Sequence, residues 1–322
     1  MNNFSIWCDF LEDSFLDNEF LNLIYSNTIN GATTNPSIFK NAILNSKQYK
    51  ERIARLNTKN AKQKYEILAI QDIKKAADKL SLNYFTNNEG FISIEIDPRL
   101  HDNTALSIGE AKRLRTEIAK DNVMIKIPAT NESYEAMYEL MKEGINVNAT
   151  LIFSYEQSIK CFEALNLGLK EFRKKNKGLK EPKAVISVFV SRYDRLLNNR
   201  VLEKNKLGIY LASFAYHYIQ TQNEANIKTL FASTGVKGDD LEKDYYIKEL
   251  LFSNCINTAP LDAIYAFKGK KIEIKKPLSL EELHQKLAQN ISKDELDEAS
   301  KFLLDDGLKQ FCIAYEDILS AL

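Results

Sequence analysis

Val123-Met124-Ile125-Lys126-Ile127-Pro128-Ala129-Thr130 is a short apolar run with a single lysine inside it. A segment that is apolar at nearly every position is typical of a strand buried on both faces. An unpaired ammonium group is costly to bury, so a lysine in such a strand is either ion-paired or deprotonated. Burial lowers the pKa of a lysine amine, and the neutral amine is a nucleophile. Two hypotheses therefore stand: Lys126 forms a Schiff base, or it is an inert, ion-paired residue.

Strand-like segments alternate with helical patterns on both sides of this run. Seven further short segments of strand character lie at 5–9, 29–35, 91–96, 146–153, 184–190, 229–233 and 254–258. Helical spacing of apolar residues separates most of them, for example over 43–56, 104–119 and 193–218. Such alternation implies parallel strands joined by right-handed crossovers, and eight units make a (β/α)8 barrel. The sequence predicts an α/β fold, a (β/α)8 TIM barrel, with a doubly wound open sheet as the alternative.

The sequence from about residue 277 onward is helical and extends past the eighth unit. Two Ser-x-x-Glu capping boxes begin helices there. The last stretch carries apolar residues at i, i+3, i+4 and i+7, among them Phe311 and Tyr315, which are candidates to cover the barrel mouth. We expect additional C-terminal helices that pack on the barrel, and a single domain over residues 1–322.

Bulk composition excludes several classes of protein. Lys plus Arg and Asp plus Glu both number 44, and this balance argues against nucleic acid or an anionic membrane as the main partner. Four well-separated cysteines without a CxxC pair indicate a reducing compartment. Acidic residues interrupt the apolar residues near the N-terminus, which is unlike a signal peptide, and no apolar run approaches the ~20 residues of a membrane span. We expect a soluble, cytoplasmic protein.

Polar residues inside the strands fall on one parity. Side chains of a strand alternate between the barrel interior and the helices, so Lys126 should point away from the face of Ile125 and Ile127. The same alternation predicts that Leu151 faces the helices. The residues predicted to point inward are Asp9, Glu95, Asn148, Thr150, Ser187 and Phe189. Because barrel enzymes build their sites at the C-terminal ends of strands, these residues are candidates for one shared site.

Each candidate also has a structural interpretation. Glu95 and Lys126 could form a buried salt bridge between neighbouring strands, and Asp9 could cap the following helix. The Ser, Thr and Asn residues could bond to local backbone. Arg192, just after the sixth strand, suits bidentate phosphate binding but could be a surface ion pair. No histidine stands at a strand end, and no cluster has metal-ligand spacing, so we predict no metal site.

Six ordered segments resemble the transaldolase family, whose members are Schiff-base-forming class I aldolases. Gly31-Ala32-Thr33-Thr34-Asn35-Pro36-Ser37-Ile38-Phe39 matches the first family signature, and the lysine strand resembles the core of the second. The other similar segments follow in order at 145–154, 187–192, 232–237 and 256–260. The resemblance covers about residues 9–261, and six motifs in order make it specific.

The resemblance implies transfer of a dihydroxyacetone unit in the pentose phosphate pathway, without a cofactor. The donor would be sedoheptulose 7-phosphate or fructose 6-phosphate, and the acceptor glyceraldehyde 3-phosphate or erythrose 4-phosphate. Lys126 would attack the ketose C2 and form the imine. Glu95, with a water held by Thr150, would be the general acid and base, and Asp9 would take the proton of the C4 hydroxyl.

The resemblance also implies a set of substrate-binding residues. Those implied for the dihydroxyacetone unit are Asn35, Asn148 and Ser187, with Phe189 lining the same site. Those implied for the phosphate are Arg192, Ser233 and Lys237.

Two departures and two alternatives accompany the resemblance. Ser133 and Tyr134 stand where the family usually has Gly and a small aliphatic residue, and Lys237 stands where some members have Arg. The nearest alternative is a fructose-6-phosphate aldolase or other class I aldolase, but Glu95 and Phe189 replace the Gln and Tyr of that subfamily. A non-catalytic sugar-phosphate-binding barrel is the remote alternative. We expect a monomer or a homodimer.

Overall fold

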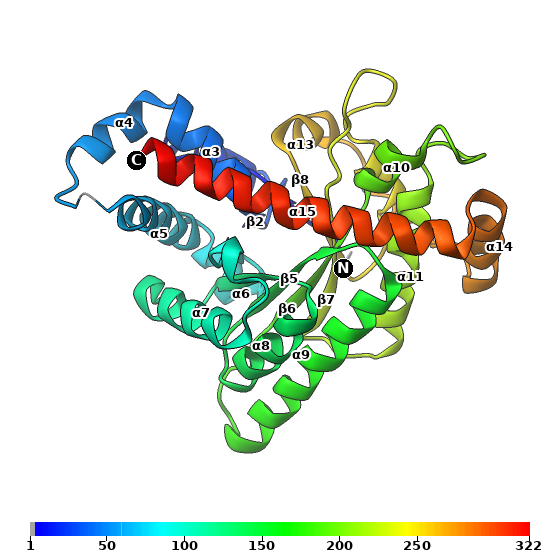
Figure 1. Ribbon diagram of the computed structural model, residues 1–322, viewed down its shortest axis with the longest axis horizontal. Helices are drawn as coiled ribbons and strands as arrows, with labels where there is room; N and C mark the ends of the chain where they lie inside the picture. Colours follow the sequence, from blue (N-terminus) through cyan, green and yellow to red (C-terminus); the bar gives the residue numbers. More distant parts are fainter. Residues whose placement is uncertain (1–3, 59) are drawn as a thin grey trace.

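Eight parallel strands close into a barrel in the computed structural model, which describes residues 4–58 and 60–322 (Figure 1). Each strand pairs with the next along the chain, and β8 pairs with β1. The strands are β1 Phe4–Cys8, β2 Gly31–Thr33, β3 Ile92–Glu95, β4 Val123–Pro128, β5 Val147–Ile152, β6 Ala184–Phe189, β7 Ile227–Ala232 and β8 Cys255–Ala259. The predicted TIM barrel is confirmed, and the open-sheet alternative is excluded. Residues 1–3, at the start of the segment judged unlike a signal peptide, lie outside the described residues.

Helices connect the strands and surround the barrel. Those between β1 and β4 are α1 Asp13–Asp17, α2 Glu19–Tyr25, α3 Pro36–Asn45, α4 Lys47–Ala54, α5 Ala61–Lys79, α6 Ser81–Asn87 and α7 Thr104–Ile118, with a 3-10 turn at Pro98–Leu100. Those that follow are α8 Asn131–Lys142, α9 Tyr155–Lys175, α10 Ser191–Leu197, α11 Leu207–Thr221, α12 Tyr245–Glu249, α13 Leu261–Phe267, α14 Leu280–Asn290 and α15 Lys293–Ala321.

Two predicted helices are interrupted. The helix expected over 43–56 breaks at Ser46, whose extended backbone ends α3 and begins α4. The helix expected over 193–218 is split into α10 and α11. In the connecting loop the Asn205 backbone N–H donates to the Asn198 side chain at 2.8 Å, and Asn205 adopts a left-handed φ of 60°. Asparagine side chains compete with helical hydrogen bonds in this way, which helical periodicity does not reveal.

Strand alternation separates two apolar layers. Ile125 and Ile127 pack in the layer between the strands and the helices, whereas Met124 lies in a separate inner cluster. The prediction for Leu151 is wrong, because this residue belongs to the inner cluster. The β5–β6 register shifts between Ala149 and Ile152, and Leu151 has a φ of 55°. Such an irregularity reverses the alternation beyond it.

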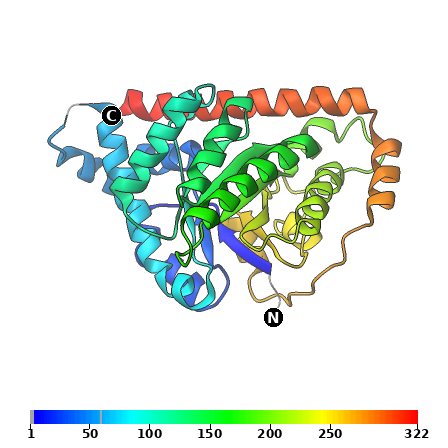
Figure 2. The same cartoon turned by 90° about the horizontal axis from the view of Figure 1, so that it is seen from below.

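Helix α15 lies across one end of the barrel. Figures 1 and 2 show it crossing the side of the molecule opposite the first residues of β1. Both expected capping boxes are present, at Ser279 before α14 and at Ser292 before α15. A Cβ atom on Gly307 would lie 3.0 Å from Cδ2 of Leu151, so α15 approaches the C-terminal end of β5 closely. Among the described residues, none of the helices is both long enough and apolar enough to cross a membrane.

Helices α8 and α9 touch at a glycine, and this contact generates a stability prediction. A Cβ on Gly168 would lie 2.4 Å from the backbone oxygen of Tyr138, whereas one on the exposed Gly109 of α7 would meet nothing. We expect Gly168→Ala to lower the free energy of unfolding by about 1–3 kcal/mol through overpacking. Gly109→Ala should raise it by up to about 1 kcal/mol. Urea unfolding of both variants measures this, and wild-type stability for Gly168→Ala would contradict the close contact.

Candidate active site

A cavity opens at the C-terminal end of the barrel beneath α15. Its walls come from the ends of seven strands, from the segments that follow them and from α15. The lining residues are Asp9, Thr33, Asn35, Lys126, Asn148, Thr150, Ser187, Phe189, Arg192, Ala232, Ser233, Thr258 and Phe311. The structure therefore brings together nearly all of the residues that the sequence analysis named as site candidates. They lie at the C-terminal end of the strands, where enzymes with a (β/α)8 barrel have their active sites.

Lys126 of this wall forms a buried pair with Glu95, which stands behind it and is not itself a lining residue. They are register partners on β4 and β3, and the Lys126 Nζ lies 3.5 Å from Oε2 of Glu95. The amine also donates to the backbone oxygen of Thr34 at 3.0 Å and lies 5.6 Å from the centre of the Phe311 ring. The two side chains are only 6% and 3% exposed. The salt bridge that the sequence offered as the structural interpretation of this pair is present. It lies beside a cavity and not in a closed core.

The Glu95 carboxyl group is suited to proton transfer near neutral pH. Burial raises the pKa of Glu95 to about 7, although the nearby Lys126 ammonium acts to lower it. Among the residues that the structure describes, neither Glu95 oxygen has a hydrogen-bond partner, nor does the Thr150 hydroxyl. Buried polar groups are normally paired, so these atoms are suited to bind water or substrate. A carboxyl with a pKa near 7 can both give and accept a proton.

Asp9 is a second carboxyl in a different environment. Burial raises the pKa of Asp9, while Lys126 and the hydroxyl of Thr33 act to lower it. Thr33 donates to Asp9 Oδ1 at 2.7 Å, and its Oγ1 lies 2.7 Å from that of Thr258. Asp9 does not cap the following helix, because the N-cap of α1 is Glu12. Carboxyls in two environments can divide acid and base roles.

Asn148 and Ser187 belong to a buried polar network. The Ser187 hydroxyl donates to Asn148 Oδ1 at 2.7 Å, and the Asn148 amide donates to Ser93 at 2.9 Å. These side chains bond to one another and not to local backbone. Asn35 has a structural role as well, because its side-chain oxygen caps α3 by accepting from Ile38 N at 3.1 Å.

Arg192 is a largely buried cation at the cavity wall. Its guanidinium lies 5.3 Å from the Phe189 ring centre and 6.0 Å from that of Phe153. Its contact with Asp306 of α15 is loose, at 3.7 Å. Burial and the neighbouring Arg195 lower the pKa of Arg192. A guanidinium held by aromatic faces with a loose ion pair is suited to bind an anion.

Lys237 is not brought into this cavity. It is exposed and lines a neighbouring cavity with Arg195, Lys204 and Gly235. Ser133 also does not line the Lys126 cavity. Its hydroxyl lies 2.8 Å from that of Thr130 at the start of α8.

Sequence reasoning did not single out Thr33, Thr258 or Ala232. The two threonines lie inside motifs that carry the family resemblance. Their position at the ends of predicted strands could have identified them as candidate site residues. Phe311 was one of two candidates to cover the mouth and does line the cavity. Tyr315 instead packs against Tyr65, with ring centres 5.3 Å apart.

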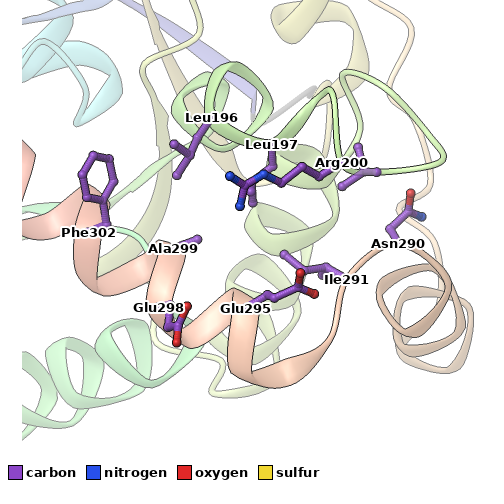
Figure 3. Close-up of a pocket in the computed structure, with 10 residues that line it drawn as sticks. Leu196, Leu197, Arg200, Asn290, Ile291, Glu295, Glu298, Ala299 and Phe302 are labelled. Carbon is purple, nitrogen blue, oxygen red and sulfur yellow. The ribbon is translucent and has the colours of Figure 1, made fainter.

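A second hollow lies between α10 and the C-terminal helices (Figure 3). Figure 3 shows Leu197, Ile291 and Phe302 around it, with Arg200 and Glu295 facing each other from opposite sides. No barrel strand contributes to its lining, so it is separate from the Lys126 cavity.

The described part of the chain holds neither a metal-binding cluster nor a disulfide. Within residues 4–58 and 60–322, no group of three His, Cys, Asp or Glu side chains could hold a metal ion. The four cysteines are free thiols, and burial raises the pKa of each of them.

Comparison with known proteins identifies the family of this chain. The family model described as Transaldolase/Fructose-6-phosphate aldolase matches residues 6–322. The chain belongs to this family. Similar proteins of the transaldolase/fructose-6-phosphate aldolase family include one named Transaldolase from Campylobacter jejuni, 67% identical over 327 residues that cover all of both chains. Another, named Transaldolase from Helicobacter pylori, is 43% identical over the same extent. The resemblance drawn from six motifs is thereby confirmed.

The raised pKa of Glu95 generates a prediction about stability and pH. In the folded state the Glu95 carboxyl keeps its proton up to about pH 7, because its pKa is about 7. In the unfolded chain its pKa takes the ordinary value of 4.5. Wild-type stability should therefore fall between about pH 4.5 and 7 and then level off, by up to about 3 kcal/mol. Gln cannot ionise, so the free energy of unfolding of Glu95→Gln should increase relative to that of the wild type as the pH rises across this range. Urea unfolding at pH 5 and pH 8 measures the change.

Asp97→Asn is the matched control for this experiment. Asp97 is also nearly buried at the end of β3, but its ion pairs with Arg99 at 2.7 Å and Lys62 at 3.1 Å outweigh burial, and its pKa is lowered. Loss of the Asp97 carboxylate in Asp97→Asn should lower the free energy of unfolding about equally at pH 5 and pH 8. A Glu95→Gln effect that is equally independent of pH would contradict the proton assignment.

Proposed function

We propose that this protein is a transaldolase, which moves a dihydroxyacetone unit from a ketose phosphate to an aldose phosphate through an imine on Lys126. The observation that carries this proposal is the buried amine of Lys126, 3.5 Å from Glu95, in the wall of a cavity at the strand C-termini. The names of the similar proteins from Campylobacter jejuni and Helicobacter pylori support it.

Imine formation is the first step. The neutral amine of Lys126 attacks the ketose C2 carbonyl, and the oxygen takes up a proton to give a carbinolamine. Loss of that hydroxyl as water, with a proton supplied from Glu95 through a water held by Thr150, leaves the iminium ion. The pKa of about 7 for Glu95 and the unpaired hydroxyl of Thr150 support these roles.

Carbon–carbon cleavage and transfer follow. Asp9 takes the proton of the C4 hydroxyl, the C3–C4 bond breaks, and its electron pair moves toward the iminium nitrogen to form an enamine. The shortened aldose leaves. The enamine C3 then attacks the aldehyde carbon of the acceptor, the new hydroxyl regains a proton from Asp9, and water releases the product ketose from Lys126.

The remaining residues of the cavity bind the substrate in this proposal. Their placement around Lys126 supports the assignment. The dihydroxyacetone hydroxyls bond to Asn35, Asn148 and Ser187 beside the ring of Phe189, and the phosphate binds Arg192 and Ser233. We leave Lys237 out of the site because it lies on the exposed loop after β7, whereas Arg192 is held on a helix.

The proposed substrates are those that the resemblance implies. The donors are sedoheptulose 7-phosphate and fructose 6-phosphate, and the acceptors are glyceraldehyde 3-phosphate and erythrose 4-phosphate. We place the enzyme in the pentose phosphate pathway of the cytoplasm, without a cofactor. The chain acts as one barrel domain, with residues from about 277 as its helical extension, in a monomer or homodimer.

Trapping of the imine tests this proposal. Borohydride reduction with fructose 6-phosphate, followed by peptide mass mapping, should give a stable adduct on Lys126 that Lys126→Ala abolishes. The acceptor assay should show transfer to erythrose 4-phosphate in excess of free dihydroxyacetone release. Glu95 and Phe189 favour transfer over the aldolase reaction of the same family. Predominant release would instead identify a fructose-6-phosphate aldolase.

Lys183→Ala is the matched control for trapping. Burial lowers the pKa of Lys183 to about 8, so this amine is the competing candidate nucleophile. It lies just before β6, at the opposite end of the barrel from the cavity. Its variant should keep the adduct and the activity. An adduct on Lys183, or none on any lysine, would overturn the Schiff-base proposal.

A further inference from the structure

Helix α10 carries two arginines, Arg192 and Arg195, on neighbouring positions of its surface. Residues three apart on a helix lie side by side. Arg192 lines the Lys126 cavity, and Arg195 lines the adjoining cavity. The two cavities meet at a pair of hydroxyls, because Ser191 of the second lies 3.1 Å from Ser233 of the first.

The guanidinium of Arg195 is left without a partner. Within residues 4–58 and 60–322 it forms neither an ion pair nor a hydrogen bond with another side chain. Asp194, beside it, is already occupied, because its two oxygens accept from Gly208 N at 3.0 Å and from the Tyr246 hydroxyl at 2.8 Å. Asp240, on the same cavity, stands in an exposed loop.

Asp306 of α15 lies 3.7 Å from Arg192. The charges of Asp194 and Asp306 both act on Arg195, although neither carboxylate forms an ion pair with it among the described residues. Burial and the proximity of Arg195 lower the pKa of Arg192, as expected where two neighbouring cations repel each other. A dianion with several oxygens would relieve this repulsion, and a phosphate monoester has that charge and geometry.

Arg195 is better placed for this ligand than Lys237. Both side chains are exposed and line the adjoining cavity, but Arg195 extends from the helix that also positions Arg192, whereas Lys237 lies on the loop after β7. A guanidinium can also bind two phosphate oxygens at once, whereas an ammonium acts as a point charge.

We propose that Arg195 is a second phosphate-binding residue, which joins Arg192 and Ser233 where the two cavities meet and selects phosphorylated sugars. The inference rests on the proposed function and adds one specificity residue to it. Arg195 supplies the second positive charge of the phosphate site, the position that the resemblance alone assigned to Lys237.

The full-length Arg195→Ala variant tests this inference. We expect the KM for fructose 6-phosphate and the inhibition constant of inorganic phosphate to rise about tenfold, with a much smaller change in kcat, because one charged hydrogen-bonding group is lost. Borohydride trapping of unphosphorylated dihydroxyacetone on Lys126 should remain at the wild-type level. Arg195→Lys should recover part of the loss.

Two further variants make the test specific. Arg200→Ala removes an arginine just past the end of α10 that lines the separate hollow of Figure 3, and Lys237→Ala removes the competing cation. Both should leave phosphate inhibition unchanged. Wild-type constants for Arg195→Ala, or an equal loss of dihydroxyacetone trapping, would overturn the inference. Absence of any imine in the wild-type protein would instead refute the proposed function, and calorimetric titration with inorganic phosphate would still test Arg195.

Discussion

The burial of Lys126 and Glu95 inside the barrel is the constraint around which the rest of the structure is arranged. Removing two charges from water costs several kcal/mol for each ion, and their attraction offsets this only with good geometry. Here the separation is 3.5 Å, and neither carboxylate oxygen forms a hydrogen bond within the described chain. The pair is therefore a poor stabilising element. The outer apolar layer between strands and helices must supply the stability that keeps this buried pair in place.

Helix α15 completes the surroundings of this pair from outside the barrel repeat. It places Phe311 over the Lys126 amine, Gly307 against Leu151 and Asp306 near Arg192. Figure 2 shows the helix along one side of the molecule, above the barrel. An aromatic ring over the amine excludes water on that side and strengthens electrostatic interactions beneath it. The C-terminal helix therefore contributes to the surroundings of Lys126 through residues that lie 180 or more positions away from it in the sequence.

Alternation along the strands predicted much of the site correctly. Lys126, Glu95, Asn148 and Ser187 all point inward because a buried parallel strand has one helix face and one interior face. The rule failed at Leu151, where a register shift reverses the alternation. It says nothing about Phe311, because a helical stripe of apolar residues does not reveal which one reaches a cavity formed by other elements.

Local periodicity also could not place the loops. The interruptions at Ser46 and between α10 and α11 depend on side-chain to backbone bonds and on single extended or left-handed residues. The placement of Lys237 in a second cavity depends on the course of the loop after β7, which a motif does not encode. The resemblance implied Lys237 as a phosphate-binding residue, whereas the fold shows that Arg195 shares helix α10 with Arg192.

The most direct test is a crystal structure of the protein reduced with borohydride in the presence of dihydroxyacetone. The account predicts continuous electron density from the Nζ of Lys126 to C2 of the bound unit. It also predicts that the hydroxyls of the unit lie within hydrogen-bonding distance of Asn148 and Ser187, with Glu95 beside the new bond. An unmodified Lys126 with the intact ion pair, or an adduct that points away from these residues, would contradict the account.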